Sequence, residues 1–115
     1  MRQITSLNNN KVIFKANVST VKEAVQLAVK QKISLDYAYL RGADLEGAYL
    51  FEVDLQEADL RNAYIRNAYI REVNLLGVDL RGADLQRVIF RGAILRGAKL
   101  EGTDLTGADL REVWF

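Results

Sequence analysis

A large apolar residue stands at every fifth position of the sequence from Leu35 to Phe115, through 17 repeats without a break. Two residues before each of them stands a small or β-branched residue, which is Ala in ten cases and Val in five. The positions between are mostly Asp, Tyr, Arg, Gly, Asn and Glu. Both apolar positions of every repeat must reach one core, and this requirement limits the possible folds severely.

Neither regular element places a period of five on one face. On an α-helix, five residues advance by about 500°, so the apolar stripe would wander round the helix. On a straight strand, five residues bring the side chain to the opposite face. The chain must therefore turn a corner in each repeat, and Gly and Asn, which favour turns, are frequent at the fifth residue. Four corners of about 90° close a coil of about 20 residues, and such coils stack at about 4.8 Å, the spacing of paired strands.

The stretches AYLRGADLEGAYL and FRGAILRGAKLEGTDLTGADL resemble the pentapeptide-repeat family, whose motif is A-(D/N)-L-x-x. The resemblance covers residues 33–115, which are 83 of the 115 residues. It implies a mainly β fold, a right-handed quadrilateral parallel β-helix of about four coils, with both apolar positions facing inward. Other residues replace the usual Asp or Asn at eight outward positions: Tyr39, Tyr49, Tyr64, Tyr69, Ile89, Ile94, Lys99 and Trp114.

Residues 1–32 differ from the repeats and predict an N-terminal cap. They carry six basic residues and one acidic residue, a net charge of +5, whereas residues 33–115 carry −4. The stretch VKEAVQLAV has one apolar helical stripe, and Thr20 and Glu23 fit a capping box, so we expect a helix at about 20–31. QITSL and KVIFKA predict short strands around a turn-prone Asn run.

The apolar stripe of this helix has an obvious partner in the open end of the first coil, and solenoids need such a cap. The alternative is a basic amphipathic helix that binds a membrane or a partner. Only two lysines lie inside the helix, which favours the cap. No apolar run approaches the ~18–20 residues of a membrane span. MRQITSLNNN has no apolar h-region, so we predict a soluble cytoplasmic protein that does not bind membranes.

The chain has no His and no Cys, which argues against a Cys/His metal site and against a His-based catalytic triad. Residues 20 apart should stack, which brings Asp59 near Asp79 and Asp84 near Asp104. Paired carboxylates can act as acid and base or bind a hard cation. The favoured alternative is a set of solvated aspartates that support the neighbouring turns. We therefore predict no enzymatic activity, no catalytic residues, no cofactor and no metal site.

Two outward columns of arginine raise the question of nucleic-acid binding. They consist of Arg41, Arg61 and Arg81, and of Arg71, Arg91 and Arg111. Three aligned arginines can meet phosphates. The adjacent corner column carries Glu52, Glu72 and Glu112, whose ion pairs should weaken the positive field. The sequence therefore argues against nucleic-acid binding.

The unusual predicted surface is apolar. Tyr49, Tyr69 and Ile89 form one outward column, and Phe51 lies beside Tyr49. Leu76 and Ile94 point outward on the next side. A contiguous apolar group suggests a contact site for another protein. The alternatives are cross-strand stacking that stabilises the ladder, or packing of the N-terminal segment on that side.

We therefore expect a non-enzymatic protein-interaction or scaffold module with a protein partner. The alternative comes from gyrase-binding members of the family, which mimic DNA and would make this chain a binder of DNA gyrase or topoisomerase. Mimicry needs a strongly anionic rod, and a charge of −4 crossed by arginine columns argues against it. Leu110, Trp114 and Phe115 should lie exposed at the other end. They predict a weak homodimer, as in those relatives, or a last repeat that folds back over the end.

Overall fold

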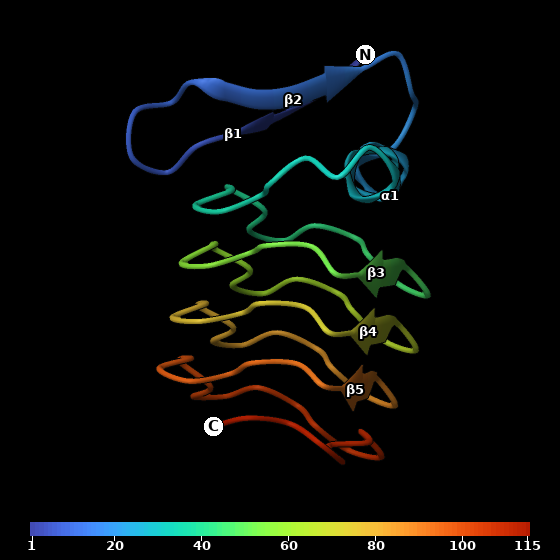
Figure 1. The fold of residues 1–115 in the computed structure, drawn as a ribbon, viewed down its shortest axis with the longest axis vertical. Coiled ribbons are helices and arrows are strands. Elements are labelled where there is room, and N and C mark those ends of the chain that lie inside the picture. Colours follow the sequence, from blue (N-terminus) through green and yellow to red (C-terminus); the bar gives the residue numbers. More distant parts are fainter.

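The computed structural model describes residues 1–115 and shows a stack of coils beneath an N-terminal hairpin and helix (Figure 1). Strands β3 (Tyr49–Phe51), β4 (Tyr69–Arg71) and β5 (Ile89–Arg91) form a parallel sheet in that order, in which neighbouring strands pair residues that are 20 apart in the sequence. On the other sides single parallel bridges join residues 20 apart, such as Tyr39 and Asp59. The chain is a β-helix, as the period of five predicts.

The core runs along the axis of the stack and contains the two apolar positions of each repeat. The large residues at every fifth position from Leu35 to Leu95 are at most 3% exposed. The small residues two positions earlier, from Ala38 to Ala93, are at most 8% exposed. Each buried large side chain contributes about 1.5–3 kcal/mol, so this column is the main stabilising feature of the fold.

The corners depend on a left-handed residue at the fifth position. Gly42 has φ +69°, and the non-glycine residues Asn62 and Glu72 adopt the same region with φ +59° and +55°. Most corners are closed by a hydrogen bond across the turn, such as the one that the Ala43 N–H donates to the Leu40 carbonyl at 3.1 Å. The turns that follow β3, β4 and β5 lack this bond. We call this stacked set of turns, residues 50–53, 70–73 and 90–93, the open corner.

Asp59 differs from the expectation that the aspartates at all these positions are solvated. Asp59 is only 2% exposed. Its carboxylate accepts hydrogen bonds from Arg61, in the same turn, and from Arg41, in the preceding coil. The two arginines cover the carboxylate because both project from the column beside it. The direction of the Asp59 side chain is outward, as predicted, but the neighbouring side chains remove it from water.

The N-terminal segment contains an antiparallel hairpin of β1 (Arg2–Thr5) and β2 (Val12–Ala16), followed by α1 (Val21–Lys30). The helix begins after Thr20, whose Oγ1 accepts a hydrogen bond from the Glu23 N–H at 3.1 Å, as a capping box requires. The apolar stripe of α1 is buried in the common core at Ala24, Val25 and Ala28. At ten residues, α1 lacks the length and apolar composition needed to cross a membrane.

Hydrogen bonds attach both the hairpin and the helix of this segment to the first coil. The N–H of Tyr39 donates to the Thr5 carbonyl, and the N–H of Leu7 donates to the Tyr37 carbonyl, both at 2.8 Å. From α1, the Lys22 ammonium donates to the Glu46 carbonyl at 2.9 Å. The hairpin therefore continues the backbone pairing of the stack, while the helix covers the exposed ends of the core side chains.

Candidate protein-binding face

Two outward columns of side chains run down the sheet β3-β4-β5. In the first column Tyr49, Tyr69 and Ile89 lie in register, and in the second Phe51 is followed by Arg71 and Arg91. The residue between the columns points inward in each strand, because side chains alternate along a strand. The structure thus places side by side four of the residues predicted to contact a partner. We call Tyr49, Phe51, Tyr69 and Ile89 the aromatic face.

The aromatic face is ordered by ring contacts. The rings of Tyr49 and Tyr69 stack with centroids 5.0 Å apart and planes 4° from parallel, and the Tyr49 and Phe51 rings lie 5.9 Å apart at 52°. Tyr49 is still 53% exposed, Phe51 42% and Tyr69 39%, and Ile89 is half-buried. Such stacking stabilises the ladder and also fixes the rings as a rigid surface.

The N-terminal segment touches this side without covering the rings. Gln26 of α1 uses its Oε1 to accept the hydrogen bond of the Tyr49 backbone N–H at 3.0 Å. The exposed fractions above show that the rings themselves stay open to solvent. The N-terminal segment, whose packing was one of the two structural alternatives for these side chains, therefore lies beside the rings and leaves them exposed. Cross-strand stacking, the other alternative, is present, and it leaves the outer surface of the pair accessible.

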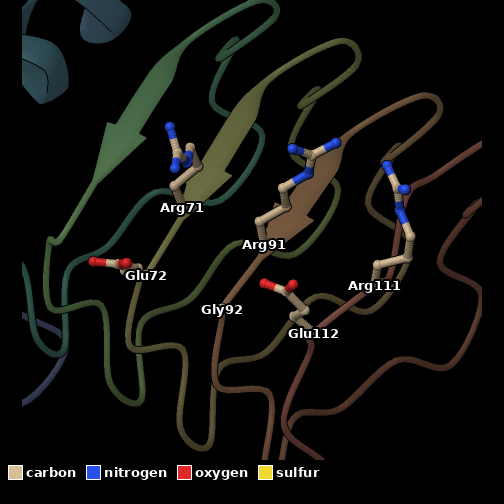
Figure 2. Close-up of a pocket in the computed structure, with 6 residues that line it drawn as sticks. All are labelled: Arg71, Glu72, Arg91, Gly92, Arg111 and Glu112. Carbon is tan, nitrogen blue, oxygen red and sulfur yellow. The ribbon is translucent and has the colours of Figure 1, made fainter.

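Hollows follow the open corner along the edge of the aromatic face. One of about 450 Å³ separates the end of α1 from Phe51 and is lined by Val29, Ile33 and Val53 together with Lys30 and Lys32. No sequence signal indicated this hollow, because it forms only where the helix meets the first coil. Below it, a hollow of about 250 Å³ extends from Phe51 to the next coil. A third, also of about 250 Å³, is lined by the column of Arg71, Arg91 and Arg111 (Figure 2). We call these three residues the arginine column.

The positive charge of the arginine column is only partly neutralised. Arg111 and Arg91 lie 2.7 and 3.6 Å from the carboxylate of Asp109, and the hydrogen bond from Arg111 holds the pKa of that carboxyl below its usual range. Arg71 forms no ion pair and no side-chain hydrogen bond. The ion pairs expected with the glutamates of the corner column do not form, and Gly92 interrupts that column (Figure 2). Asp109 is therefore the neutralising group that the sequence analysis missed.

Leu76 and Ile94 do not join the aromatic face. They line a separate hollow of about 470 Å³ together with Trp114 and Phe115, two of the residues predicted at the dimer interface. Trp114 is 67% exposed, Phe115 68% and Leu110 37%, so Trp114 and Phe115 do not fold back over the end of the stack. The predicted contact residues thus form two groups, one on the sheet and one near the end of the stack.

The stacked aspartates give little basis for catalysis. Asp59 pairs with Asp79, and Asp84 with Asp104, as the 20-residue spacing predicts. Hydrogen bonds from Arg81 and from Thr106 lower the pKa values of Asp79 and Asp104, which stabilises the charged form and opposes proton donation. No group of three or more Asp, Glu, His or Cys side chains is placed to hold a metal ion.

Residues 32–67 and 73–112 match the family model of pentapeptide repeats, in eight copies. This chain is a member of the pentapeptide-repeat family. Among solved structures, a pentapeptide-repeat protein of Nostoc PCC 7120 is similar, with 34% identity and a TM-score of 0.72, over 82% of this chain and 78% of that one. No curated protein matches the chain.

Two further pentapeptide-repeat proteins of known structure are similar to this one. A protein of the cyanobacterium Cyanothece 51142 has 38% identity and a TM-score of 0.65 over 67% of this chain. A protein of the Arabidopsis thaliana thylakoid lumen has 32% identity and a TM-score of 0.63 over 64% of this chain. The chain spans 53% and 51% of their lengths, about half of each.

Proposed function

We propose that this pentapeptide-repeat protein is a non-enzymatic interaction module that binds another protein through the aromatic face. The stacked pair of Tyr49 and Tyr69, with Phe51 beside it, carries the proposal. Tyr and Phe are enriched at the centres of protein interfaces, where rigid rings bury much area at little cost in side-chain entropy. Here the ladder fixes the rings before a partner arrives, and the hollow beside Phe51 offers space for an apolar side chain of that partner.

We further infer the finer architecture that the family implies: a right-handed, four-sided helix of about four coils over residues 33–115, with residues 1–32 as its cap. Pairing at a spacing of 20 residues, which is four repeats of five, supports the four sides. A cytoplasmic location and a weak homodimer through Leu110, Trp114 and Phe115 belong to the same proposal. The exposure of these three side chains supports the homodimer.

DNA mimicry receives less support than the interaction module. A mimic presents a continuous anionic surface, whereas here the carboxylates of Asp59, Asp79 and Asp84 are each bonded to an arginine. A gyrase supercoiling assay separates the two functions. Inhibition or protection of gyrase by this protein at tens of micromolar would favour mimicry.

The double variant Tyr49→Ser, Tyr69→Ser tests the aromatic face. Partners captured from the source cell by the wild-type protein are identified, purified and measured again by titration calorimetry. We expect the double variant to keep its melting temperature within a few degrees and to lose binding by about tenfold or more. Tyr64→Ser is the matched control, since Tyr64 is 57% exposed and lies in a different column, between Asp44 and Asp84.

Binding that survives in the double variant would contradict the aromatic face as the contact site. Equal losses in the double variant and in Tyr64→Ser would also contradict it, because a general effect of removing exposed rings would then explain both.

A further inference from the structure

The N-terminal end of the molecule presents an unpaired strand edge. β2 is the last strand at this end and pairs only with β1 (Figure 1). β1 in turn pairs with the first coil, where Ser6 bridges to Ala38 in antiparallel sense. Backbone pairing thus runs from the coils through β1 to β2 and stops there. The outer edge of β2 keeps N–H and carbonyl groups available for one more strand.

The register of the hairpin shows which residue of β2 faces outward. The Thr5 carbonyl accepts a hydrogen bond from Tyr39, so the backbone of Thr5 faces the first coil. Backbone groups alternate in direction along a strand, so Ile4 faces β2, where its partner is Phe14. Lys15 follows Phe14 and therefore directs its N–H and carbonyl to the open edge. Its side chain is exposed.

This edge lies in the most basic part of the chain. Residues 1–32 have a net charge of +5, and none of the seven ion pairs in the structure involves any of them. Glu23, the single acidic residue, is held in the capping box by Thr20. Lys15 is exposed on β2, and Lys11 is exposed immediately before the strand begins. The positive charge of this segment is therefore not neutralised by ion pairs, whereas the coils carry a net negative charge.

We propose that the outer edge of β2 binds an extended acidic segment of another protein as an added strand. The free backbone groups specify a polypeptide in extended form, since a ladder of alternating N–H and carbonyl groups is what a strand completes. The lysines specify its charge, because a carboxylate opposite Lys15 forms a favourable cross-strand pair and Lys11 adds positive charge beside the strand. The same lysines disfavour pairing between two copies of this edge, since like charges would then meet.

A phosphate backbone would satisfy the lysines without using the strand edge. An extended acidic peptide uses both features, and this is why a peptide is the favoured occupant. The proposed site is separate from the aromatic face, so the double variant Tyr49→Ser, Tyr69→Ser should bind such a peptide as the wild-type protein does. The two proposals can therefore fail independently.

Fluorescence anisotropy with a labelled peptide in which Glu alternates with Thr tests the inference. We expect saturable binding to the wild-type protein, and binding weaker by about tenfold for a matched peptide with Gln in place of Glu. Lys99→Gln is the control for overall charge, since Lys99 is exposed in the column of Asp79 and should leave binding unchanged. Equal affinity for the Glu and Gln peptides would overturn the proposal.

Two variants at Lys15 separate the contribution of the backbone N–H to peptide binding from the contribution of the charge. Lys15→Gln removes the charge and keeps the N–H, whereas Lys15→Pro removes both, and an edge strand tolerates proline where the N–H faces outward. We expect the proline variant to bind the Glu peptide more weakly than the glutamine variant, by about threefold or more. Equal affinity of the two variants would show that no strand is added. Circular dichroism checks that both variants remain folded.

Hydrogen exchange of the wild-type protein gives a second readout that needs no variant. The amide of Lys15 should exchange at least about tenfold more slowly when the Glu peptide is saturating, because an added strand protects it. Unchanged exchange at Lys15 would overturn the proposal. A labelled DNA duplex that binds more tightly than the peptide, with equal affinity for the proline and glutamine variants, would replace it with a phosphate site.

Discussion

The carboxylate of Asp59 accepts two hydrogen bonds from the guanidinium of Arg61, with Oδ1 3.0 Å from Nε and Oδ2 2.8 Å from Nη2. Arg41 of the preceding coil lies 3.3 Å from the same Oδ2 through its Nε. The Asp59 Oδ1 also accepts the backbone N–H of Arg61 at 3.1 Å. One buried carboxylate therefore joins two coils and fixes a turn at the same time.

Replacing Asp59 with Ala should lower the free energy of unfolding by about 1–3 kcal/mol, because the backbone N–H and two guanidinium groups lose their acceptor. Asp79→Ala is the matched control. Asp79 holds the same kind of turn but is more exposed, so its loss should cost less than ~1 kcal/mol. Urea unfolding measures both. Equal costs for the two variants would show that the burial of Asp59 has no energetic effect.

Leu75 lies in the middle of the core column and is 2% exposed. Leu75→Ala should cost about 2–5 kcal/mol, because it removes buried methyl groups and leaves a cavity that neighbouring coils cannot fill. Urea unfolding of Leu75→Ala and Asp79→Ala side by side compares an inward with an outward position. If Asp79→Ala proved the more destabilising of the two, the inward and outward assignment would be wrong.

Acid should destabilise the protein through its paired aspartates. Hydrogen bonds from Arg81 and Arg111 hold the pKa values of Asp79 and Asp109 below those of the unfolded chain. Their contribution is therefore complete above the ordinary Asp pKa of about 3.9 and is lost as the pH falls through the lower folded values. The urea midpoint should be nearly constant from about pH 7 to 5 and should fall below about pH 4.

Replacing both Asp79 and Asp109 with Asn removes the titration of these two carboxyl groups. The double variant Asp79→Asn, Asp109→Asn should start from a lower urea midpoint at neutral pH and lose less of it in acid. A wild-type midpoint that rises below about pH 4 would contradict the sign of both pKa shifts.

Deleting residues 1–31 should expose the first coil. The deletion removes Ile4 and Val25 from the core and takes away the carbonyl of Thr5 that pairs with Tyr39. The truncated chain should aggregate or melt at a much lower temperature, because apolar ends and an open strand edge both meet water. Light scattering and thermal melts measure this. A monomeric truncation with an unchanged melting temperature would show that the hairpin and helix serve another purpose.

The exposed residues Leu110, Trp114 and Phe115 predict a concentration-dependent homodimer. The contact would be small, so we expect dissociation in the micromolar range. Light scattering after size exclusion, from about 1 to about 500 µM, should show a mass that rises above 13.0 kDa. Trp114→Arg should keep the protein monomeric at the highest concentration. A constant mass of one chain in both proteins would remove the homodimer.

The period of five was sufficient to predict the β-helix and its core, because geometry allows only one inward arrangement for both apolar positions. It was sufficient for the aromatic face too, since residues 20 apart must stack, as Tyr49 and Tyr69 do. Thr20 and Glu23 likewise indicated where α1 begins. These features follow from local rules that any coil of the stack obeys.

Other features depend on which neighbours a side chain meets. Asp59 and Asp79 have the same motif position, and each carboxylate contacts arginines from two coils. Only Asp59 accepts a hydrogen bond from the arginine of the preceding coil, and only Asp59 is buried. The open corner has no simple sequence signal either. Tyr49 and Tyr69 lack the carboxylate that supports other turns, but Tyr64 lacks it as well and the turn after it is closed by the Ala68 N–H. Local rules fix the path of the backbone and leave such contacts undetermined.

The core repeats every five residues, whereas the surface columns repeat every 20. An insertion of one repeat anywhere in the coils would leave every downstream Leu facing inward and would move every downstream surface residue to the next side. Five residues inserted between β3 and β4 would separate Tyr69 from Tyr49 without disturbing the core. An insertion of 20 residues, which is one full coil, would leave every downstream surface residue on its original side. Duplication of one repeat in the gene can therefore rearrange the surface columns of such a protein in a single step while its core stays intact.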